Sequence, residues 1–396
     1  MSDARFDVVK DTLAQRSIDA DDVVDKLTRQ HIETPSWGYA DSGTRFEVFH
    51  QPGAARTVEE KLSDAAQVHK LTAVCPSVAI HIPWDKTDDW AAMAEYAASL
   101  GLSLGAVNPN LFQELEYKLG SLTHEDRQVR RKAVDHMLEC VDIGRTIGST
   151  ILSCWFADGT NYAGQGNLRR RKRYMQEGLA EVYKAMPPGM RMLLEYKFFE
   201  PAFYHTDIAD WGMSYTFCLK LGDRAQVLVD LGHHPLGTNI EHIVAFLIDE
   251  GRLGGFHFNS KKYADDDTTV GSVNPYELFL IYNELIDGEL DDTVDMDVAY
   301  MIDQSHNIKN KIEAMIQSVE NIQTAYAKAL CIDRRALREA QVAGDVYAAE
   351  NELVRAFNVD AMALIREARR RMGVPEDPVA AFRAGGYAEK AAAERA

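Results

Sequence analysis

The sequence contains little cysteine and no long apolar run. Its 396 residues include five scattered cysteines and no CxxC pair: Cys75, Cys140, Cys154, Cys218 and Cys331. This odd, dispersed set argues against a disulfide scaffold and favours reduced thiols in the cytoplasm. No stretch of about 18 apolar residues occurs, and the N-terminus MSDARFDVVKDT has no apolar signal segment. We therefore expect neither a membrane span nor secretion.

Two further absences restrict the function. No GxGxxG follows the first expected strand and no GxxxxGK[ST] occurs, which weakens the case for an open nucleotide-binding sheet. Acidic residues (61) outnumber basic residues (43), and the formal net charge of −18 should repel phosphate backbones and anionic lipids. The run RRRKR at 169–173 is a local basic patch, which we interpret as a solvated helix start. No nucleic-acid or membrane partner is expected.

The sequence does contain short apolar runs that alternate with helical patterns. Helical patterns lie at 90–101, 240–251 and 310–330. Near-continuous hydrophobicity in several runs is typical of parallel strands covered on both faces. This alternation predicts an α/β fold, a (β/α)8 TIM barrel, with a doubly wound open sheet as the alternative. The eight expected strands are 45–49, 77–82, 102–107, 149–155, 191–197, 226–231, 254–259 and 298–305.

The two ends of the chain do not fit eight repeats. We expect an N-terminal helical segment over 1–34, the catalytic barrel over 35–331 and a C-terminal helical extension over 332–396. The extension is charged, rich in alanine and ends in GGYAEKAAAERA. Contact with a neighbouring subunit, a lid and a mobile tail are all compatible with this composition.

Ligand-type residues mark the ends of four successive expected strands. Function in a (β/α)8 barrel gathers at the C-terminal ends of the strands. Three carboxylates and an imidazole there would carry about three negative charges at neutral pH, which is costly in a confined site unless cations offset it. Such an oxygen-rich set suits Mn²⁺, Mg²⁺ or Co²⁺. We therefore predict a metal centre formed by Glu195, Asp230, His257 and Asp303.

More ligand-type residues follow the sixth and seventh strands. His233 stands three residues after Asp230, and Asp265 and Asp267 lie on one side of an expected extended segment. A second ion bridged by Glu195 is consistent with this set, since two-metal sites hold their ions roughly 3.5–4 Å apart.

Each of these residues alone also has an ordinary structural explanation. A strand-end carboxylate is commonly a helix cap or a salt-bridge partner, and a run of Asp is commonly a solvated face. Asp295 and Asp297 share the strand parity of Asp303 and compete with it as ligands. Asp303 is preferred because it follows the apolar stretch. The prediction of a metal centre therefore depends on the whole set.

Side chains near the same strand ends predict a pocket for a small polyol. Lys197 stands two residues after Glu195, so both point toward the barrel axis, where an ammonium can polarise a substrate oxygen or relay a proton. The alternative for this pair is a structural ion pair. Aromatic rings with a few polar groups are typical of sugar sites, although any one tryptophan taken alone is more often part of the core. The pocket candidates are Trp37, Phe46, His81, Trp84, Asn108, Trp155 and Asn161.

Seven motifs in collinear order resemble one enzyme family. They run from about Trp37 to His306: SWGYADSGTRF, HIPWD, SCWFADGTNYAGQGN, LLEYKFFEPAFYHTD, VLVDLGHH, GFHFNSKKYADDD and MIDQSHN. They are similar to L-rhamnose isomerase of the broad-specificity bacterial type, within the xylose-isomerase-like TIM-barrel superfamily. The resemblance implies a homotetramer that interconverts L-rhamnose and L-rhamnulose and accepts other aldoses. It also implies two divalent ions per subunit, most often Mn²⁺, with Mg²⁺, Co²⁺ or Zn²⁺ as alternatives.

The resemblance also implies roles for individual residues. Glu195, Asp230, His257 and Asp303 would bind a structural ion, and Glu195 would be shared with a catalytic ion bound by His233, Asp265 and Asp267. Lys197, His81 and Asp303 are the expected catalytic residues, with His81 in ring opening. The expected sugar contacts are Trp37, Phe46, His81, Trp155, Lys197 and Ser305, where Phe46 would reach into the adjacent subunit's pocket.

The sequence leaves the reaction route and two other functions open. A hydride shift and an ene-diol proton transfer, each assisted by a metal-bound water, both fit the expected site. A sugar epimerase of the same superfamily and a non-catalytic sugar-binding barrel are the alternative functions. An apurinic-site endonuclease conflicts with the negative charge and the lack of a basic groove.

Overall fold

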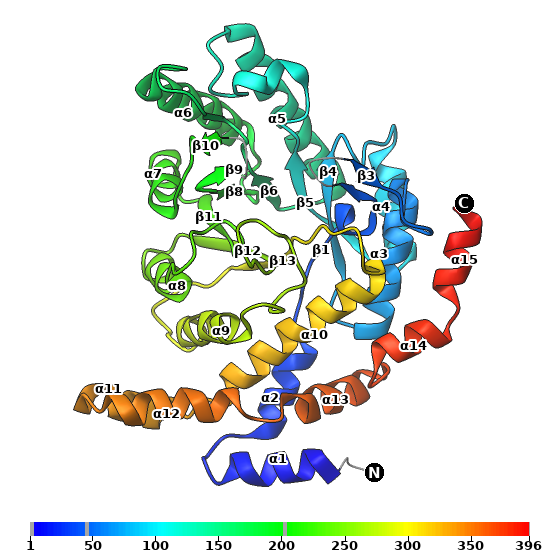
Figure 1. Cartoon of the computed structure of the whole chain (residues 1–396), viewed down its shortest axis with the longest axis vertical. Coiled ribbons are helices and arrows are strands. Elements are labelled where there is room, and N and C mark those ends of the chain that lie inside the picture. Colours follow the sequence, from blue (N-terminus) through cyan, green and yellow to red (C-terminus); the bar gives the residue numbers. More distant parts are fainter. Residues whose placement is uncertain (1–3, 44–46, 201–203, 396) are drawn as a thin grey trace.

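An eight-stranded parallel sheet forms the centre of the molecule (Figure 1). The computed structural model describes residues 4–43, 47–200 and 204–395. Glu33 bridges Met301 in parallel, and its main chain bonds with Tyr300 and Ile302 at 2.8 and 2.9 Å, which joins the first strand to the last. The predicted TIM barrel is therefore confirmed. Its strands, in sheet order, are β1 (Thr34–Pro35), β4 (Ser77–Ile82), β5 (Ser103–Pro109), β6 (Ile151–Cys154), β8 (Arg191–Glu195), β11 (Ala225–Asp230), β12 (Leu253–Phe258) and β13 (Ala299–Ile302).

Helices cover the outside of this sheet. Local signals set their ends: Asn239 caps the start of α8, and Gly148, in the left-handed region, ends α5. The predicted helices at 90–101, 240–251 and 310–330 are confirmed within two residues at each end. The covering helices are α3 (Val58–Thr72), α4 (Trp90–Ser99), α5 (Arg127–Ile147), α6 (Leu168–Ala185), α7 (Trp211–Leu221), α8 (Ile240–Asp249), α9 (Pro275–Glu289) and α10 (Lys311–Leu330).

The first expected strand, at 45–49, is wrong. Its described part, β3 (Val48–Phe49), pairs antiparallel with β2 (Ser42–Gly43) in a hairpin separate from the barrel, and both β3 side chains are exposed. The first barrel strand is β1 instead. Two residues have no periodicity, so hydrophobic pattern alone could not identify it.

Smaller elements decorate the barrel. A three-stranded sheet consists of β7 (Gly159–Thr160), β10 (Tyr204–Thr206) and β9 (Phe199–Glu200), and two short 3₁₀ helices cover 36–39 and 115–119. The basic run at 169–173 opens α6, where Arg171 is buried against Asp207 at 2.7 Å.

All five cysteines are buried and free. Within the described part of the chain, no helix is long and apolar enough to cross a bilayer.

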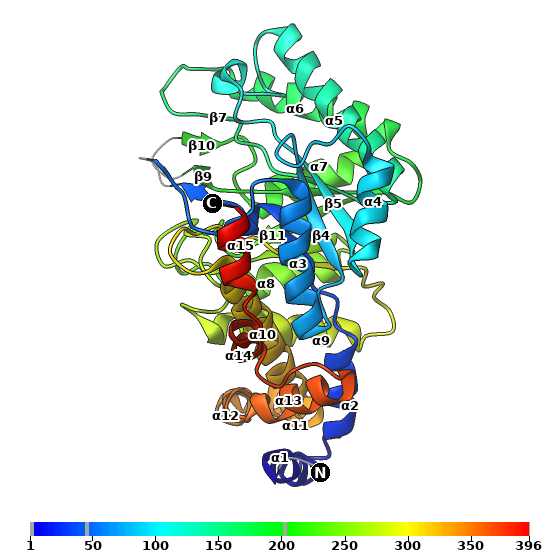
Figure 2. The same ribbon diagram turned by 90° about the vertical axis from the view of Figure 1, so that its right-hand side faces the viewer.

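The helices of the two chain ends gather beyond α10, and the last of them run up along α3 (Figures 1 and 2). Helices α1 (Ala4–Ala14) and α2 (Ala20–Thr28) share a small core with α13 (Ala361–Met372), including Phe6, Leu27 and Leu364. Residues 334–395 pack on their own barrel, and whether they also contact a neighbouring subunit stays a prediction. The extension contains α11 (Arg334–Ala343), α12 (Val346–Phe357), α13 (Ala361–Met372), α14 (Pro378–Ala384) and α15 (Tyr387–Glu394).

Candidate functional site

The four ligand-type side chains at consecutive strand ends converge. Glu195 and Asp230 end β8 and β11, His257 lies in β12 opposite Asp230, and Asp303 follows β13. One potential ligand atom from each lies within 4.8 Å of the others, and three of the four side chains are buried. Among residues 4–43, 47–200 and 204–395, this is the one such cluster of at least three His, Cys, Asp or Glu side chains.

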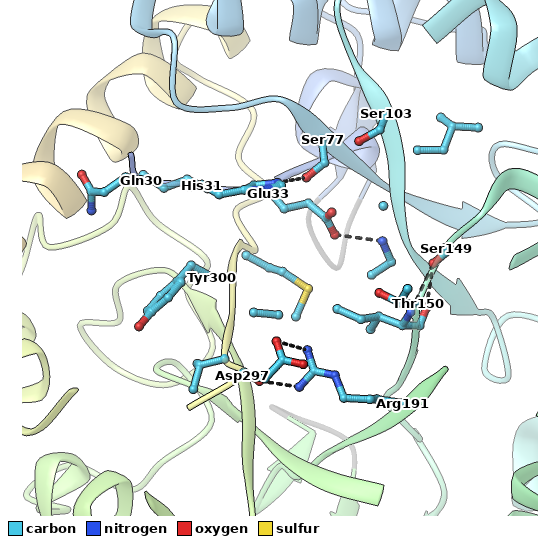
Figure 3. A pocket seen from close by; sticks show the side chains of 18 of the residues that line it. Gln30, His31, Glu33, Ser77, Ser103, Ser149, Thr150, Arg191, Asp297 and Tyr300 are labelled. Carbon is cyan, nitrogen blue, oxygen red and sulfur yellow. Dashed lines mark hydrogen bonds and ion pairs between the residues drawn. The ribbon is translucent and has the colours of Figure 1, made fainter. Parts of the chain in front are cut away.

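The competing aspartates lie elsewhere. Asp295 is exposed, and Asp297 pairs with Arg191 at 3.3 Å. Figure 3 shows this pair in a cavity of about 670 Å³. Residues that begin barrel strands, such as Ser77 of β4 and Ser103 of β5, line this cavity. Asp297 therefore lies at the N-terminal end of the barrel, and Asp303 at the C-terminal end.

Three hydrogen-bond donors orient two of the carboxylates of the cluster, those of Asp230 and Asp303. The Asn259 amide donates to both oxygens of Asp230 at 3.0 Å, and the Gly232 amide donates to one of them at 2.6 Å. The Trp37 indole donates to Asp303 at 2.7 Å. Sequence reasoning missed Asn259, although it shares the strand parity of His257 and follows β12 directly.

The electrostatics of the cluster fit a divalent ion. Burial by itself would raise the pKa of Glu195, but His257 and His233 lower it to about 2. Burial raises the pKa of Asp230 to about 6 and also raises that of Asp303. Burial would lower the pKa of His257, whereas Glu195 raises it to about 9. The raised pKa values of Asp230, Asp303 and His257 favour extra protons in the cluster, and a dication would supply the same positive charge and displace them.

A second group of ligand-type residues adjoins Glu195. His233 Nδ1 lies 3.1 Å from Glu195, and its Nε2 lies 2.8 Å from Asp265. Burial, Asp265 and Asp303 raise the pKa of Asp267 well above its usual range. The expected neighbourhood of His233, Asp265 and Asp267 is therefore present, and Glu195 contacts both groups.

The loop that carries Asp265 and Asp267 is not the extended segment expected. Both residues have left-handed backbones, with φ of 53° and 45°. Asp tolerates this region better than most residues, and such conformations concentrate where structure and function constrain a loop. A bridge between Ser260 and Thr268 closes the loop, so both aspartates still reach the same cavity.

Lys197 lies between this second group and an aromatic wall. Its ammonium is buried and pairs with Asp265 at 2.5 Å. The same ammonium stands over the Trp155 ring at 4.9 Å from the centroid. The ion pair with Asp265 and the contact with the Trp155 ring together orient the Lys197 ammonium toward the cavity.

A cavity of about 580 Å³ opens beside the cluster. One predicted contact is not found there: Asn161 is exposed and does not line the cavity. Phe46 lies outside the described residues, so its contact stays a prediction. Phe112, which sequence reasoning missed, lies 4.9 Å from Trp155 between ring centroids. The candidates that do line the cavity are Trp37, His81, Trp84, Asn108, Trp155, Lys197 and Ser305.

Contacts with neighbouring residues fix the position of His81 near the end of β4. Its ring stacks on Trp84 at 3.9 Å, and its main-chain amide donates to Asp85 at 2.7 Å. Asp85 is in turn paired with Lys61 at 2.5 Å. Burial lowers the pKa of His81 to about 3, so the ring is neutral at ordinary pH.

Comparison with known proteins agrees with this geometry. Residues 64–287 match the family described as xylose isomerase-like TIM barrel. The chain is also 44% identical over 395 residues to a probable sugar isomerase of Rhizobium meliloti (strain 1021), which covers 98% of this chain and 92% of that protein. The chain belongs to the xylose isomerase-like TIM barrel family.

More distant proteins are also similar to this xylose isomerase-like chain. The xylose isomerase of Thermus thermophilus is 27% identical over 194 residues, which is 47% of this chain and 50% of that protein. The solved structure of an L-ribulose 3-epimerase has a TM-score of 0.58 at 14% identity and covers 79% of this chain and 98% of that one. At that identity the likeness shows the fold alone.

Proposed function

We propose that this xylose isomerase-like barrel is a metal-dependent aldose–ketose isomerase that interconverts L-rhamnose and L-rhamnulose and accepts other aldoses. The convergence of Glu195, Asp230, His257 and Asp303 beside an aromatic cavity carries this proposal. The relatives named as probable sugar isomerases support isomerisation. Similarity of the sequence motifs to L-rhamnose isomerase supports the choice of sugar.

Two divalent ions per subunit, most often Mn²⁺, are part of the proposal. Glu195, Asp230, His257 and Asp303 would hold one ion. Glu195 would also hold the second, together with His233, Asp265 and Asp267. Bound there, such ions act as Lewis acids toward the oxygens of a sugar.

The other residues of the cavity would bind and orient the sugar. Trp37 and Trp155 would cover its apolar faces and exclude water. Lys197, held by Asp265 and Trp155, would donate a hydrogen bond to the sugar oxygen on which charge develops.

Proton transfer would involve the two remaining catalytic candidates. His81 Nδ1 is buried and has no hydrogen-bond partner among the described residues, so a neutral imidazole is free to bond with a ring oxygen during opening. Asp303 would be the second group, and the Trp37 indole fixes its orientation. A homotetramer is also proposed, with Phe46 in the adjacent subunit's pocket.

An aldose panel tests the function. The protein is stripped with a chelator, assayed with L-rhamnose and unrelated aldoses, and assayed again after Mn²⁺ is returned, with the products separated by chromatography. L-rhamnulose formed only after Mn²⁺ returns, and fastest from L-rhamnose, would support the proposal. Equal turnover of unrelated aldoses would contradict the proposed sugar. An epimeric aldose as the only product, with no ketose formed, would indicate an epimerase.

Lys197→Ala distinguishes an enzyme from a sugar-binding barrel. Loss of one preorganised donor typically lowers kcat about 10²–10³-fold. The variant should lose activity to that extent and keep its metal content, whereas Lys70→Ala, which removes an exposed lysine of α3, should match the parent. Parental turnover by Lys197→Ala would show that the role assigned to this lysine is wrong.

A further inference from the structure

Residues 387–395 attach to the barrel through a buried arginine. The Arg395 guanidinium donates to both carboxylate oxygens of Asp64 in α3 at 2.8 and 2.9 Å. The Tyr387 hydroxyl donates to the same carboxylate at 2.8 Å. Figure 2 shows α15, which ends at Glu394, beside α3. Asp64 and Arg395 are both almost fully buried, so removal of either would leave a charge without its partner in the interior.

The same guanidinium also binds a loop of the barrel. Arg395 donates to the Gly53 carbonyl at 2.7 Å. Gly53 has φ of +79°, and a Cβ there would lie 3.2 Å from the main-chain nitrogen of Ala392. A glycine thus permits both the turn and the close approach of α15. Segment 50–57 is therefore held between α15 and the barrel.

Segment 50–57 is in turn bonded to the wall of the sugar cavity. The Ala55 amide donates to the Tyr39 carbonyl at 3.1 Å, and Ala40 and Ala55 form a parallel bridge. The Gln51 amide donates to Asp41 at 2.8 Å. Residues 37 and 40–43 line the cavity, so these bonds fix the main chain of that wall.

A second anchor holds the other side of this wall. Lys311, at the start of α10, donates to the Ser42 hydroxyl at 3.1 Å, and that hydroxyl lies 2.8 Å from Ser305. Since this anchor does not involve α15, the wall would keep one attachment if the arginine were lost.

We propose that Arg395 is a positioning residue for the sugar site. It fixes segment 50–57 and, through that segment, the cavity wall over residues 37–43. The consequence for turnover rests on the proposed function, whereas the consequence for the main chain does not. Loss of Arg395 loosens one attachment of the wall, so sugar binding weakens while the four strand ends keep their geometry.

Hydrogen exchange on the intact protein tests the positioning role directly. In Arg395→Ala, the amides of Gln51, Ala54 and Ala55 should exchange at least about tenfold faster, while those of β11 and β12 keep the parental rate. Arg383→Ala is the matched control, because Arg383 lies in the same extension and forms a similar double ion pair with Glu313 at 2.7 and 2.8 Å. It should leave exchange at all these amides unchanged.

Two milder variants keep the test valid if Arg395→Ala does not fold. Arg395→Lys retains the charge without the two-pronged geometry, and Tyr387→Phe removes one hydrogen bond to Asp64. Both should accelerate the same amides by a smaller factor. Parental exchange at those amides in every foldable Arg395 variant, or acceleration spread equally over the barrel strands, would overturn the proposal.

Kinetics provide the second readout. Arg395→Ala should raise the KM for the sugar about fivefold or more and change kcat by less than about twofold, with partial recovery in Arg395→Lys. A fall in kcat of about fivefold or more with no change in KM would contradict a role of Arg395 in holding the wall of the sugar cavity. If the parent protein turns over no sugar, the proposed function fails, and the exchange result still decides the positioning role.

Discussion

Asn259 provides a sharp test of how the metal centre is held. Its amide makes two hydrogen bonds of 3.0 Å to Asp230, which is fully buried at the centre of the cluster. Hydrogen bonds to charged groups contribute about 1.5–3 kcal/mol. Loss of an outer partner of a ligand typically weakens metal binding about 10–100-fold, or about 1.4–2.7 kcal/mol. The two ranges agree, so Asn259→Ala should weaken Mn²⁺ binding by about that factor.

Competition with a coloured chelator measures this affinity without any sugar. Asn108→Ala is the matched control: Asn108 is also buried and lines the same cavity, but its amide donates to the Ile80 carbonyl at 3.1 Å. The control should bind Mn²⁺ within about twofold of the parent, since no outer partner of a ligand is removed. Parental affinity in Asn259→Ala, or an equal loss in both variants, would refute the role of this amide.

Two further predictions concern stability. A Cβ on Gly105 would lie 1.6 Å from a Glu33 oxygen, so Gly105→Ala should lower the free energy of unfolding by about 1–3 kcal/mol, measured with denaturant. Gly189→Ala is the control and should leave the free energy of unfolding nearly unchanged, because the space around Gly189 is open. Burial lowers the pKa of His81 from 6.5 to about 3, so the unfolded chain takes up the proton first. This group should therefore make the free energy of unfolding fall by about 1.4 kcal/mol per pH unit as the pH drops from about 6.5 toward about 3. The slope of stability against pH should be correspondingly shallower in His81→Asn. Equal slopes in the parent and the variant would show that His81 is not buried in its neutral form.

Strand ends were predictable because an apolar run shows where a buried strand stops. The C-terminal ends of parallel strands meet on one face of a barrel, so Glu195 and Asp230 could be placed together without coordinates. The same reasoning separated Asp297, which precedes β13, from Asp303, which follows it. It failed for β1, since a strand of two residues has no pattern.

The surroundings of the cluster were harder to predict. Asn259 and Phe112 have no distinctive motif, and their roles come from contacts across neighbouring strands and loops. The left-handed turns at Asp265 and Asp267 depend on loop closure rather than on local alternation. The anchoring of Arg395 to Asp64 spans most of the chain, so no local pattern could indicate it.

The most direct test of the metal centre is the number of Mn²⁺ ions bound per subunit, measured by equilibrium dialysis and elemental analysis. We expect two ions in the parent protein, loss of both in Glu195→Gln because both groups share this carboxylate, and retention of both in Asp297→Asn at the opposite end of the barrel. A parent protein that binds no divalent ion, or a Glu195→Gln variant that binds as many ions as the parent, would contradict the account.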